Sequence, residues 1–341
     1  MARIELSKNA FFHNLSFLSQ KLGVKEKLAI VLKDNAYGHG LLPMAQLSAE
    51  FGLQTAIVRT FHEAEQIKTL FSKIIILNPV APFISNERYS LTINNLAQFT
   101  SLPNGVNIEL KVDTGMHRNG IAHHELHEAF QMIKNKKLTL SGVMTHFRSA
   151  DELSSELFWQ LQKWREVKQD VALLCKKHQI PPPSFHSANS AAALRLNHYE
   201  DDFARCGIAT YGYHQMPDIF GSFDLKPVLK LIAQKITTVS LKEGERLGYG
   251  GRFTASHDMR VSTYDIGYGD GFFRFDGNGT FTPDGKRILG KISMDSFSLE
   301  GESEEVSIIG DAKEIADFFG TISYDVLVKL QPHIPRIIMK G

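Results

Sequence analysis

The strongest constraint on the fold is a regular alternation of short apolar runs with amphipathic stretches over the first two thirds of the chain. Short apolar runs bounded by turn residues are typical of buried strands, and apolar side chains at helical spacing indicate helices. Strands that alternate with helices predict right-handed βαβ units and a parallel sheet. The apolar runs cover 28–33, 55–60, 74–78, 91–93, 107–113, 140–146, 184–188 and 203–209, and the helical stretches cover 41–51, 61–71, 123–135 and 155–178.

Eight such runs within about 200 residues predict a closed (β/α)8 barrel of the TIM type. A chain of 341 residues exceeds what one core ordinarily serves, so a smaller second domain is expected. After about residue 220 the strand-like runs follow one another closely between glycine-rich turns, which indicates a mostly β domain. These later runs cover 227–241, 259–266, 286–299 and 305–309, with helices expected near 312–319 and 323–330. We therefore predict a cofactor-binding barrel over 1–220 and a mostly β domain over 221–341.

Composition excludes several classes of protein. A net charge of +1 gives no electrostatic case for binding nucleic acid or an anionic membrane. No run approaches the roughly 18 apolar residues of a membrane span, and the N-terminal residues form no secretory signal. Cys175 and Cys206 lack metal-ligand spacing, so we expect no metal and two reduced, buried thiols. The expected location is the cytoplasm.

The stretch Leu28–Gly40 carries the first chemical signal. Its apolar residues run directly into Lys33, and a polar loop with two glycines, Tyr37 and His39 follows. Active sites of barrels are built at the C-terminal ends of the strands, which is where Lys33 would emerge. A solvated charge at a strand end is the simpler interpretation. A lysine in a crowded polar loop can instead act as a nucleophile toward a carbonyl group.

Other polar residues follow the predicted strands at the same edge. Each one alone would be explained by solvent at a strand end, so the argument rests on their convergence. They are Arg59, Lys111, Asp113, Arg118, His146, Asn189, Ser190, Arg205 and Gly207.

The segments after the seventh and eighth strands predict an anion site. Asn189 or Ser190 would cap the short helix that follows, leaving backbone N–H groups free to face a phosphate. Gly207 and Ile208, just after Arg205, would add further backbone, because barrels often bind phosphate between these two loops. Helix capping alone is the alternative for Asn189 and Ser190. A phosphate site together with a strand-end lysine suggests pyridoxal phosphate.

Three loops of the predicted β domain also carry unusual residues. Tyr249 lies between glycines in the segment 246–251, and Tyr268 lies in a second glycine-rich turn, 266–271. Met294 precedes a carboxylate that interrupts a strand pattern. Tyrosines at loop tips are most often packing residues, so these loops gain meaning only together with the barrel.

Taken together, these segments resemble the pyridoxal-phosphate-dependent alanine racemases. The matching motifs follow the family's order over nearly the whole chain, and the family's barrel plus C-terminal β domain agrees with the predicted fold. One departure is Asp34, where many members have alanine. The motifs cover 31–40, 110–118, 145–147, 186–190, 205–208, 248–250, 267–271 and 293–295.

The resemblance implies roles around the cofactor. Lys33 would hold pyridoxal phosphate covalently, and Arg205 would face the ring nitrogen. Arg118 would order the ring oxygen and the substrate. Lys111 matches a lysine that is often carbamylated in the family and then accepts hydrogen bonds from an arginine such as Arg118. The phosphate would be held by Tyr37, Asn189, Ser190, Gly207 and Ile208.

The resemblance further implies a homodimer with shared sites. Tyr249 of the other subunit would be the second base, opposite Lys33, and His146 would link Arg205 to it. Met294 of the other subunit would offer its backbone N–H to the substrate carboxylate, and Tyr268 would line the entrance.

The C-terminal segment departs from the family. A second phosphate-binding tyrosine is expected just before a Val-Pro-Arg-like segment, but Pro332 stands there. Weaker phosphate binding and a substitute role for Tyr324 are the two alternatives.

The predicted function is the interconversion of L- and D-alanine by two bases, supplying D-alanine for peptidoglycan. A racemase of broader specificity, for example for serine, remains an alternative. A barrel-type decarboxylase is a further one, against which Arg205 argues, since such enzymes place an acidic residue at the ring nitrogen. A non-catalytic cofactor carrier would need neither Tyr249 nor the β domain.

Overall fold

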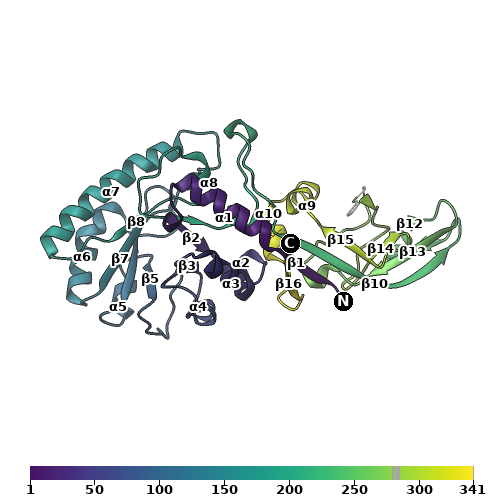
Figure 1. Cartoon of the computed structure of the whole chain (residues 1–341), viewed down its shortest axis with the longest axis horizontal. Coiled ribbons are helices and arrows are strands. Elements are labelled where there is room, and N and C mark those ends of the chain that lie inside the picture. Colours follow the sequence, from purple (N-terminus) through teal and green to yellow (C-terminus); the bar gives the residue numbers. More distant parts are fainter. Residues whose placement is uncertain (279–280, 282–284, 341) are drawn as a thin grey trace. The chain divides into compact units, whose positions relative to one another are not determined.

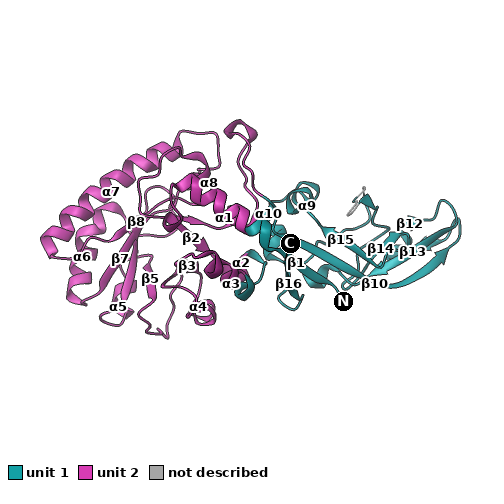
Figure 2. Ribbon diagram, in the orientation of Figure 1, with its two compact units in different colours: residues 1–11, 37–43, 226–341 teal, residues 12–36, 44–225 magenta. Residues whose placement is uncertain are grey.

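The computed structural model describes residues 1–278, 281 and 285–340 (Figure 1). The chain forms two compact units, each discontinuous in sequence (Figure 2). We call residues 12–36 and 44–225 the barrel unit, and residues 1–11, 37–43 and 226–341 the β unit. The first residues belong to the β unit because strand β1 (Arg3–Ser7) pairs with strands near the other end of the chain. The predicted domain boundary near residue 220 stays a prediction. The sequence did not predict that the N-terminal strand belongs to the β unit.

Eight strands of the barrel unit form one parallel sheet in the order β8-β7-β6-β5-β4-β3-β2-β9. The barrel is nearly closed: two backbone hydrogen bonds of 2.9 Å, from Asp202 to Phe185 and from Arg205 to Ala188, bridge the edges formed by β8 and β9. This arrangement confirms the predicted barrel. The strands are β2 (Leu28–Val31), β3 (Thr55–Val58), β4 (Lys73–Ile76), β5 (Tyr89–Ile93), β6 (Asn107–Lys111), β7 (Thr139–Met144), β8 (Ser184–His186) and β9 (Ala204–Cys206).

Helices connect these strands, and Figure 1 shows the long helices α6 and α7 on the outer side of β7 and β8. In α7 an apolar stripe that includes Leu157, Trp164 and Val171 is buried, as the helical spacing predicts. The α-helices that begin or end in this unit are α1 (Lys8–Leu22), α2 (Lys33–Tyr37), α3 (Leu41–Phe51), α4 (Phe61–Ile67), α5 (Gln98–Ser101), α6 (Leu126–Asn135), α7 (Glu156–His178) and α8 (Ser190–Arg195). Short 3-10 turns are η1 (Lys25–Lys27), η2 (His123–Glu125), η3 (Ile208–Tyr211) and η4 (Asp218–Phe220).

The barrel interior is mostly apolar but includes charged side chains. Glu109 in β6 and His186 in β8 are fully buried, and Arg205 in β9 is 7% exposed. Buried charges are stable only when they are paired and hydrogen-bonded, so these residues indicate an internal polar network.

The β unit is a mostly antiparallel sheet in the order β14-β13-β10-β1-β16, with β15 also pairing with β10. The long strand β10 (Leu229–Leu241) organises it, pairing with β1, β13 and β15. The predicted mostly β domain and its two helices are confirmed. The other elements are β11 (Arg246–Leu247), η5 (Tyr249–Gly251), β12 (Phe253–Thr254), β13 (Met259–Tyr264), η6 (Tyr268–Asp270), β14 (Phe297–Glu300), β15 (Glu305–Ile309), α9 (Ala312–Phe319), α10 (Ser323–Val328) and β16 (Arg336–Met339).

One predicted strand is much shorter than expected. Of the run 286–299 only its end enters a strand, β14, while Ile288 makes an isolated bridge to Leu299. Gly290 adopts a positive φ of 73°, which turns the chain out of the sheet. The loop that follows, Ser293–Asp295, packs instead against the turn that holds Tyr268, as described below. No helix in the part of the chain that the structure describes is long and apolar enough to span a membrane.

Candidate active site

The short element α2 is not a right-handed helix but a left-handed turn that follows Lys33 directly. Asp34, Asn35 and Ala36 have φ of 54°, 55° and 52°, and Tyr37 continues with 53°. Each such residue costs about 1–2 kcal/mol, so neighbouring groups must hold the turn in place. Glu63 at the start of α4 accepts the Asp34 N–H at 2.7 Å. The strained turn fixes where the chain leaves β2, and therefore where the Lys33 side chain begins.

The strand-end cations converge in the barrel unit. Burial, followed by the positive charges of Arg205, Arg118 and Lys33, lowers the pKa of Lys111 to about 8. Burial and these cations also lower the pKa of His146 to about 3. Such effects require the charged groups to lie near one another, as their shared strand edge predicts. A concentration of positive charge of this kind suits an anionic ligand.

Arg205 is held by four acceptors. Its Nη1 donates to Nδ1 of His186 at 2.9 Å and to the His186 carbonyl, and its Nη2 donates to the carbonyls of Thr145 at 2.6 Å and Ser187 at 3.2 Å. Among the described residues, the Nε–H of Arg205 has no acceptor. The guanidinium therefore has one donor left in a fixed position, and a ring nitrogen is an acceptor that would fit it.

The imidazole that is hydrogen-bonded to Arg205 is that of His186. The predicted link from Arg205 through His146 stays a prediction. His146 follows Thr145, whose carbonyl is one of the Arg205 acceptors, and its own carbonyl accepts from Gln160 at 3.3 Å. Sequence reasoning quoted His186 within a motif but gave it no role, and it missed Glu109, which contacts His186 at 2.9 Å. A carboxylate inside an apolar strand run is the signal that would have found it.

The predicted phosphate residues divide into two groups. Ser190 Oγ accepts the N–H groups of Gly207 at 3.0 Å and Ala209 at 3.3 Å, so the structure brings Ser190, Gly207 and Ile208 together. The N–H of Ile208 has no acceptor within the described part of the chain, and the Ser190 hydroxyl hydrogen is left to donate. Asn189 caps α8 by accepting the Ala192 N–H at 3.0 Å. Helix capping, one of its two predicted roles, is therefore observed.

Tyr37 is placed in the β unit, where it meets Tyr324 of α10. The two ring centroids are 5.8 Å apart. The chain after Tyr37 is pressed against the same helix, since a Cβ on Gly38 would lie 1.9 Å from the Leu327 carbonyl oxygen. Tyr324 is thus a neighbour of Tyr37, the predicted phosphate ligand. Tyr324 is the residue suggested above as a substitute for the tyrosine that Pro332 replaces.

The β unit also joins two of the predicted substrate residues. Gly269 donates its N–H to the Met294 carbonyl at 2.7 Å, and a Cβ on Gly267 would lie 2.3 Å from the same oxygen. The turn that holds Tyr268 therefore supports the Met294 loop. Within the described residues, the N–H of Met294 has no acceptor, and its side chain is 63% exposed. Tyr249, on a separate glycine-flanked loop, is 69% exposed.

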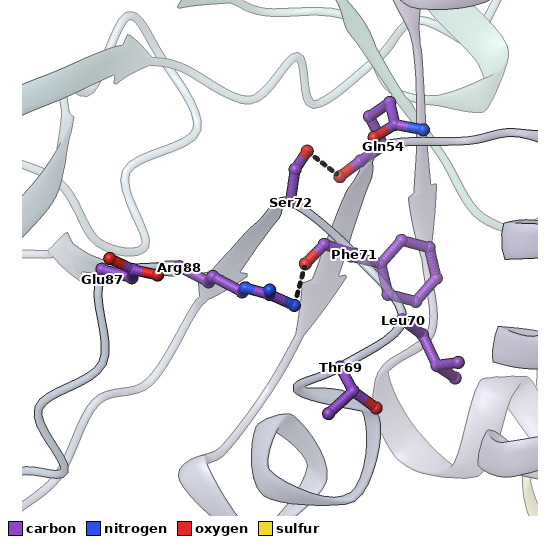
Figure 3. A pocket seen from close by; sticks show the side chains of 7 residues that line it. All are labelled: Gln54, Thr69, Leu70, Phe71, Ser72, Glu87 and Arg88. Carbon is purple, nitrogen blue, oxygen red and sulfur yellow. Dashed lines mark hydrogen bonds between the residues drawn. The ribbon is translucent and has the colours of Figure 1, made fainter.

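A cavity of about 480 Å³ lies at the other end of the barrel strands (Figure 3). Its walls come from the segments that precede β4 and β5, with hydrogen bonds from Ser72 Oγ to the Gln54 carbonyl at 3.0 Å and from Arg88 Nη1 to the Phe71 carbonyl at 3.5 Å. None of the predicted site residues lines it. Barrel chemistry occurs at the opposite face, so this cavity is not the candidate active site.

Comparison with solved structures gives the class of protein. An alanine racemase from Streptomyces lavendulae matches with a TM-score of 0.84 and 25% identity, over 100% of this chain and 97% of that one. The alanine racemase from Bacillus anthracis, solved with bound L-Ala-P, matches with a TM-score of 0.85 and 26% identity, over 100% and 95%. The fold and the strand-end lysine site therefore define a racemase of the barrel-plus-β-domain class.

Sequence comparison identifies the family. The models described as alanine racemase N-terminal domain and C-terminal domain match residues 6–215 and 228–338. Alanine racemases from Nitratiruptor sp. and Campylobacter curvus are 50% and 45% identical, each over 98% of this chain and 99% of the relative. The chain belongs to the alanine racemase family and is an isomerase. The decarboxylase alternative is not favoured.

Proposed function

We propose that this racemase interconverts L- and D-alanine on pyridoxal phosphate. The observation that carries the proposal is Arg205, whose terminal nitrogens are fully engaged while one N–H stays available beside the strand-end lysine site. That donor fits a pyridine nitrogen. The identity to relatives named alanine racemase supports alanine as the substrate.

The residues present fit the cofactor. Ser190 and the N–H of Ile208 would hold the phosphate, with Asn189, Gly207 and Tyr37 assigned to it by resemblance. Arg205 Nε would hold the ring nitrogen, and the Lys33 amine would hold the aldehyde carbon. Bound there, the cofactor withdraws electrons from the substrate α-carbon and makes its hydrogen acidic.

Racemisation requires a proton to leave one face of the α-carbon and another to reach the opposite face. One group cannot readily serve both faces of a held carbon, so two are needed. The amine of Lys33 is freed when the substrate amine takes its place on the aldehyde carbon, and it would then serve one face. The partner subunit's Tyr249 would serve the other. By resemblance, the tyrosine acts on L-alanine and the lysine on D-alanine, with His146 assigned to the link between Arg205 and the tyrosine.

Arg205 decides which reaction follows. A guanidinium stays protonated, so Arg205 donates a hydrogen bond to the ring nitrogen without transferring its proton. Negative charge then stays near the substrate α-carbon, where Lys33 or the tyrosine returns a proton. Proton delivery to the wrong carbon, which would lead to transamination, is suppressed.

The substrate would be positioned by groups from both subunits of a homodimer. Arg118 would bind the substrate and the ring oxygen, and the partner's Met294 would donate its backbone N–H to the carboxylate, with the partner's Tyr268 at the entrance. The high exposure of Tyr249 and Met294 supports their use by another subunit. Lys111, with its pKa lowered to about 8, has a neutral amine available for carbamylation near neutral pH. A cytoplasmic enzyme that supplies D-alanine for peptidoglycan accords with this activity.

Exchange of the α-hydrogen tests the proposal. Incubation with L-alanine in heavy water is expected to exchange the α-hydrogen and abolish optical rotation together. Parallel reactions with serine, lysine and arginine measure the breadth of the substrate pocket. Exchange with serine but not with alanine would show that serine, not alanine, is the substrate. Absence of exchange with every amino acid would reject the proposed activity.

A further inference from the structure

A chain of polar and charged side chains runs through the interior of the barrel. Lys73, the first residue of β4, is 24% exposed and reaches Glu109 in the middle of β6 at 2.8 Å. Glu109 contacts His186 at the end of β8, and His186 contacts Arg205 in β9, each at 2.9 Å. Barrel interiors are usually filled by layers of branched apolar side chains. A buried carboxylate in that position needs a reason.

The two oxygens of Glu109 have different partners. Oε1 accepts from Lys73 Nζ at 2.8 Å and from Ser90 Oγ at 2.7 Å. Oε2 faces His186 Nε2 at 2.9 Å. Burial favours the neutral acid, but the hydrogen bond from His186 and the charge of Lys73 outweigh it and lower the pKa of Glu109. Glu109 is therefore a carboxylate at neutral pH, with its orientation set by Lys73.

The partners of His186 determine where its proton lies. Arg205 can only donate hydrogen bonds, so Nδ1 of His186 must accept. Burial lowers the pKa of His186 to about 4, so the ring is neutral and carries one proton. That proton must be on Nε2, where Glu109 accepts it. The carboxylate thus selects the tautomer that allows the histidine to hold the guanidinium.

The surroundings are shaped for this arrangement. Gly142 of β7 makes room for the carboxylate, because a Cβ there would lie 1.9 Å from Glu109 Oε2. Phe203 stacks on the His186 ring, with centroids 4.3 Å apart and planes at 19°. Lys73 Nζ lies 5.7 Å from the centre of the same Phe203 ring. The carboxylate, the imidazole and the ammonium group are therefore each held from a second side.

We propose that Glu109 is a positioning residue of this racemase, which fixes the His186 tautomer and through it the orientation of Arg205. Lys73 acts one step further out, by determining which Glu109 oxygen faces the histidine. Glu109 touches neither cofactor nor substrate. The consequence for the reaction rests on the proposed role of Arg205, whereas the tautomer is a property of the chain itself.

The substitution Glu109→Gln tests the proposal sharply, since it keeps the shape of the side chain. Lys73 can only donate, so it requires the amide oxygen at the Oε1 position and places the amide NH2 against His186 Nε2. Two donors cannot face each other at Nε2. We expect the histidine proton to move to Nδ1, because Arg205 keeps the carbonyls of His186, Thr145 and Ser187 as acceptors and can give up its contact with Nδ1. There it opposes the Nη1–H groups of Arg205, which lose an acceptor.

The double variant Lys73→Met, Glu109→Gln should reverse this effect. Without the ammonium group the amide is free to turn its oxygen toward His186, and the Ser90 hydroxyl can accept from the NH2 group instead. The Nε2–H tautomer is then restored. Glu65→Gln is the matched control, because Glu65 also accepts from a lysine and a hydroxyl, Lys68 at 2.9 Å and Tyr89 at 2.6 Å, without any contact with His186 or Arg205.

The tautomer is measured on the holoenzyme labelled with ¹⁵N-histidine, using long-range ¹H–¹⁵N correlation and a His186→Asn variant for assignment. We expect Nε2–H in the wild type and the Glu65→Gln control, Nδ1–H in Glu109→Gln, and Nε2–H again in the double variant. In parallel, the yield of oxo acid per racemised alanine should rise about tenfold in Glu109→Gln, as for one lost hydrogen bond to a charged group. It should fall back in the double variant.

Persistence of Nε2–H in Glu109→Gln would overturn the proposal, as would a changed tautomer with an unchanged oxo-acid yield. Should Glu109→Gln not fold, Gly142→Ala displaces the carboxylate while keeping its charge and is expected to raise the oxo-acid yield in the same direction. An unchanged yield there would reject the role of Glu109. A wild type that racemises nothing, yet shows the predicted tautomers, would reject the proposed function and leave the Glu109 contact established.

Discussion

The two units hold their candidate functional residues in different ways. In the barrel unit, Arg205 and Ser190 are buried and fastened by several hydrogen bonds each. In the β unit, Tyr249 and Met294 stand on exposed loops that are stiffened by glycine-dependent backbone turns. The barrel unit is therefore pre-organised by its own interior, whereas the β unit presents its candidate residues on exposed loops. This difference is what the proposed sharing of the site between two subunits requires.

The largest expected effect comes from dividing the two bases between subunits. Lys33→Ala and Tyr249→Phe should each reduce racemisation by at least about a thousandfold, because each removes one of the two proton-transfer groups. Mixing and reassorting the two inactive dimers should restore roughly a quarter of wild-type activity, since half of the dimers then contain one intact site. Activity is measured by optical rotation after mild dissociation and reassociation.

The matched control mixes Lys33→Ala with a Lys33→Ala, Tyr249→Phe double variant, which cannot create an intact site. Absence of recovery in the main experiment would show that both bases belong to one subunit. Recovery in the control would show that the regained activity does not come from a site containing Lys33. The contrast between the two units would then lose its functional meaning.

A smaller effect tests the pre-organisation of the barrel unit. Glu63 accepts the backbone N–H of Asp34 and Arg59, each at 2.7 Å, and that of Thr60 at 3.3 Å. Glu63→Ala removes the acceptor that holds the left-handed turn after Lys33, and should lower the free energy of unfolding by about 2 kcal/mol. Urea unfolding measures this loss. Racemase activity measured without urea should fall by more than the fraction of unfolded protein accounts for.

Glu65→Ala, two positions along the same helix, is the comparison for Glu63→Ala. It removes contacts with Lys68 and Tyr89 but none with the turn. Equal losses of activity in the two variants would mean that the turn is not what positions Lys33.

The sequence predicted most of the fold because the barrel strands are short apolar runs, and it predicted the strand edge where Lys33, Lys111 and Arg205 meet. It did not predict the left-handed turn. Asp34 and Asn35 tolerate a positive φ without requiring it, Ala36 gives no signal for it, and the turn depends on the distant Glu63. The prediction of a continuous strand over 286–299 was wrong for a similar reason. The path of the chain there depends on a contact between the Ser293–Asp295 loop and the turn that holds Tyr268.

The hydrogen-bond network of Glu109, His186 and Arg205 could not be predicted from the sequence for a different reason. Glu109 and His186 stand in strands whose periodicity shows burial but not which side chains meet across the barrel. Their pairing depends on the register of β6, β7 and β8, which places Glu109 beside Gly142. Strand pattern alone cannot supply that register, so polar residues inside apolar runs are the ones to examine first.

The smallest expected effect concerns Tyr324, and it tests whether this residue of the β unit helps to hold the cofactor phosphate. Tyr324 stands 5.8 Å from Tyr37, ring centre to ring centre, although proline occupies position 332. If Tyr324 helps to hold the phosphate, Tyr324→Phe should weaken cofactor binding about fivefold, as one neutral hydrogen bond would. Cofactor affinity is measured by fluorescence titration of the stripped enzyme. Pro332→Ala is the control and should leave the affinity unchanged; an effect of Pro332→Ala alone would favour the alternative in which the 332 segment, rather than Tyr324, sets the strength of phosphate binding.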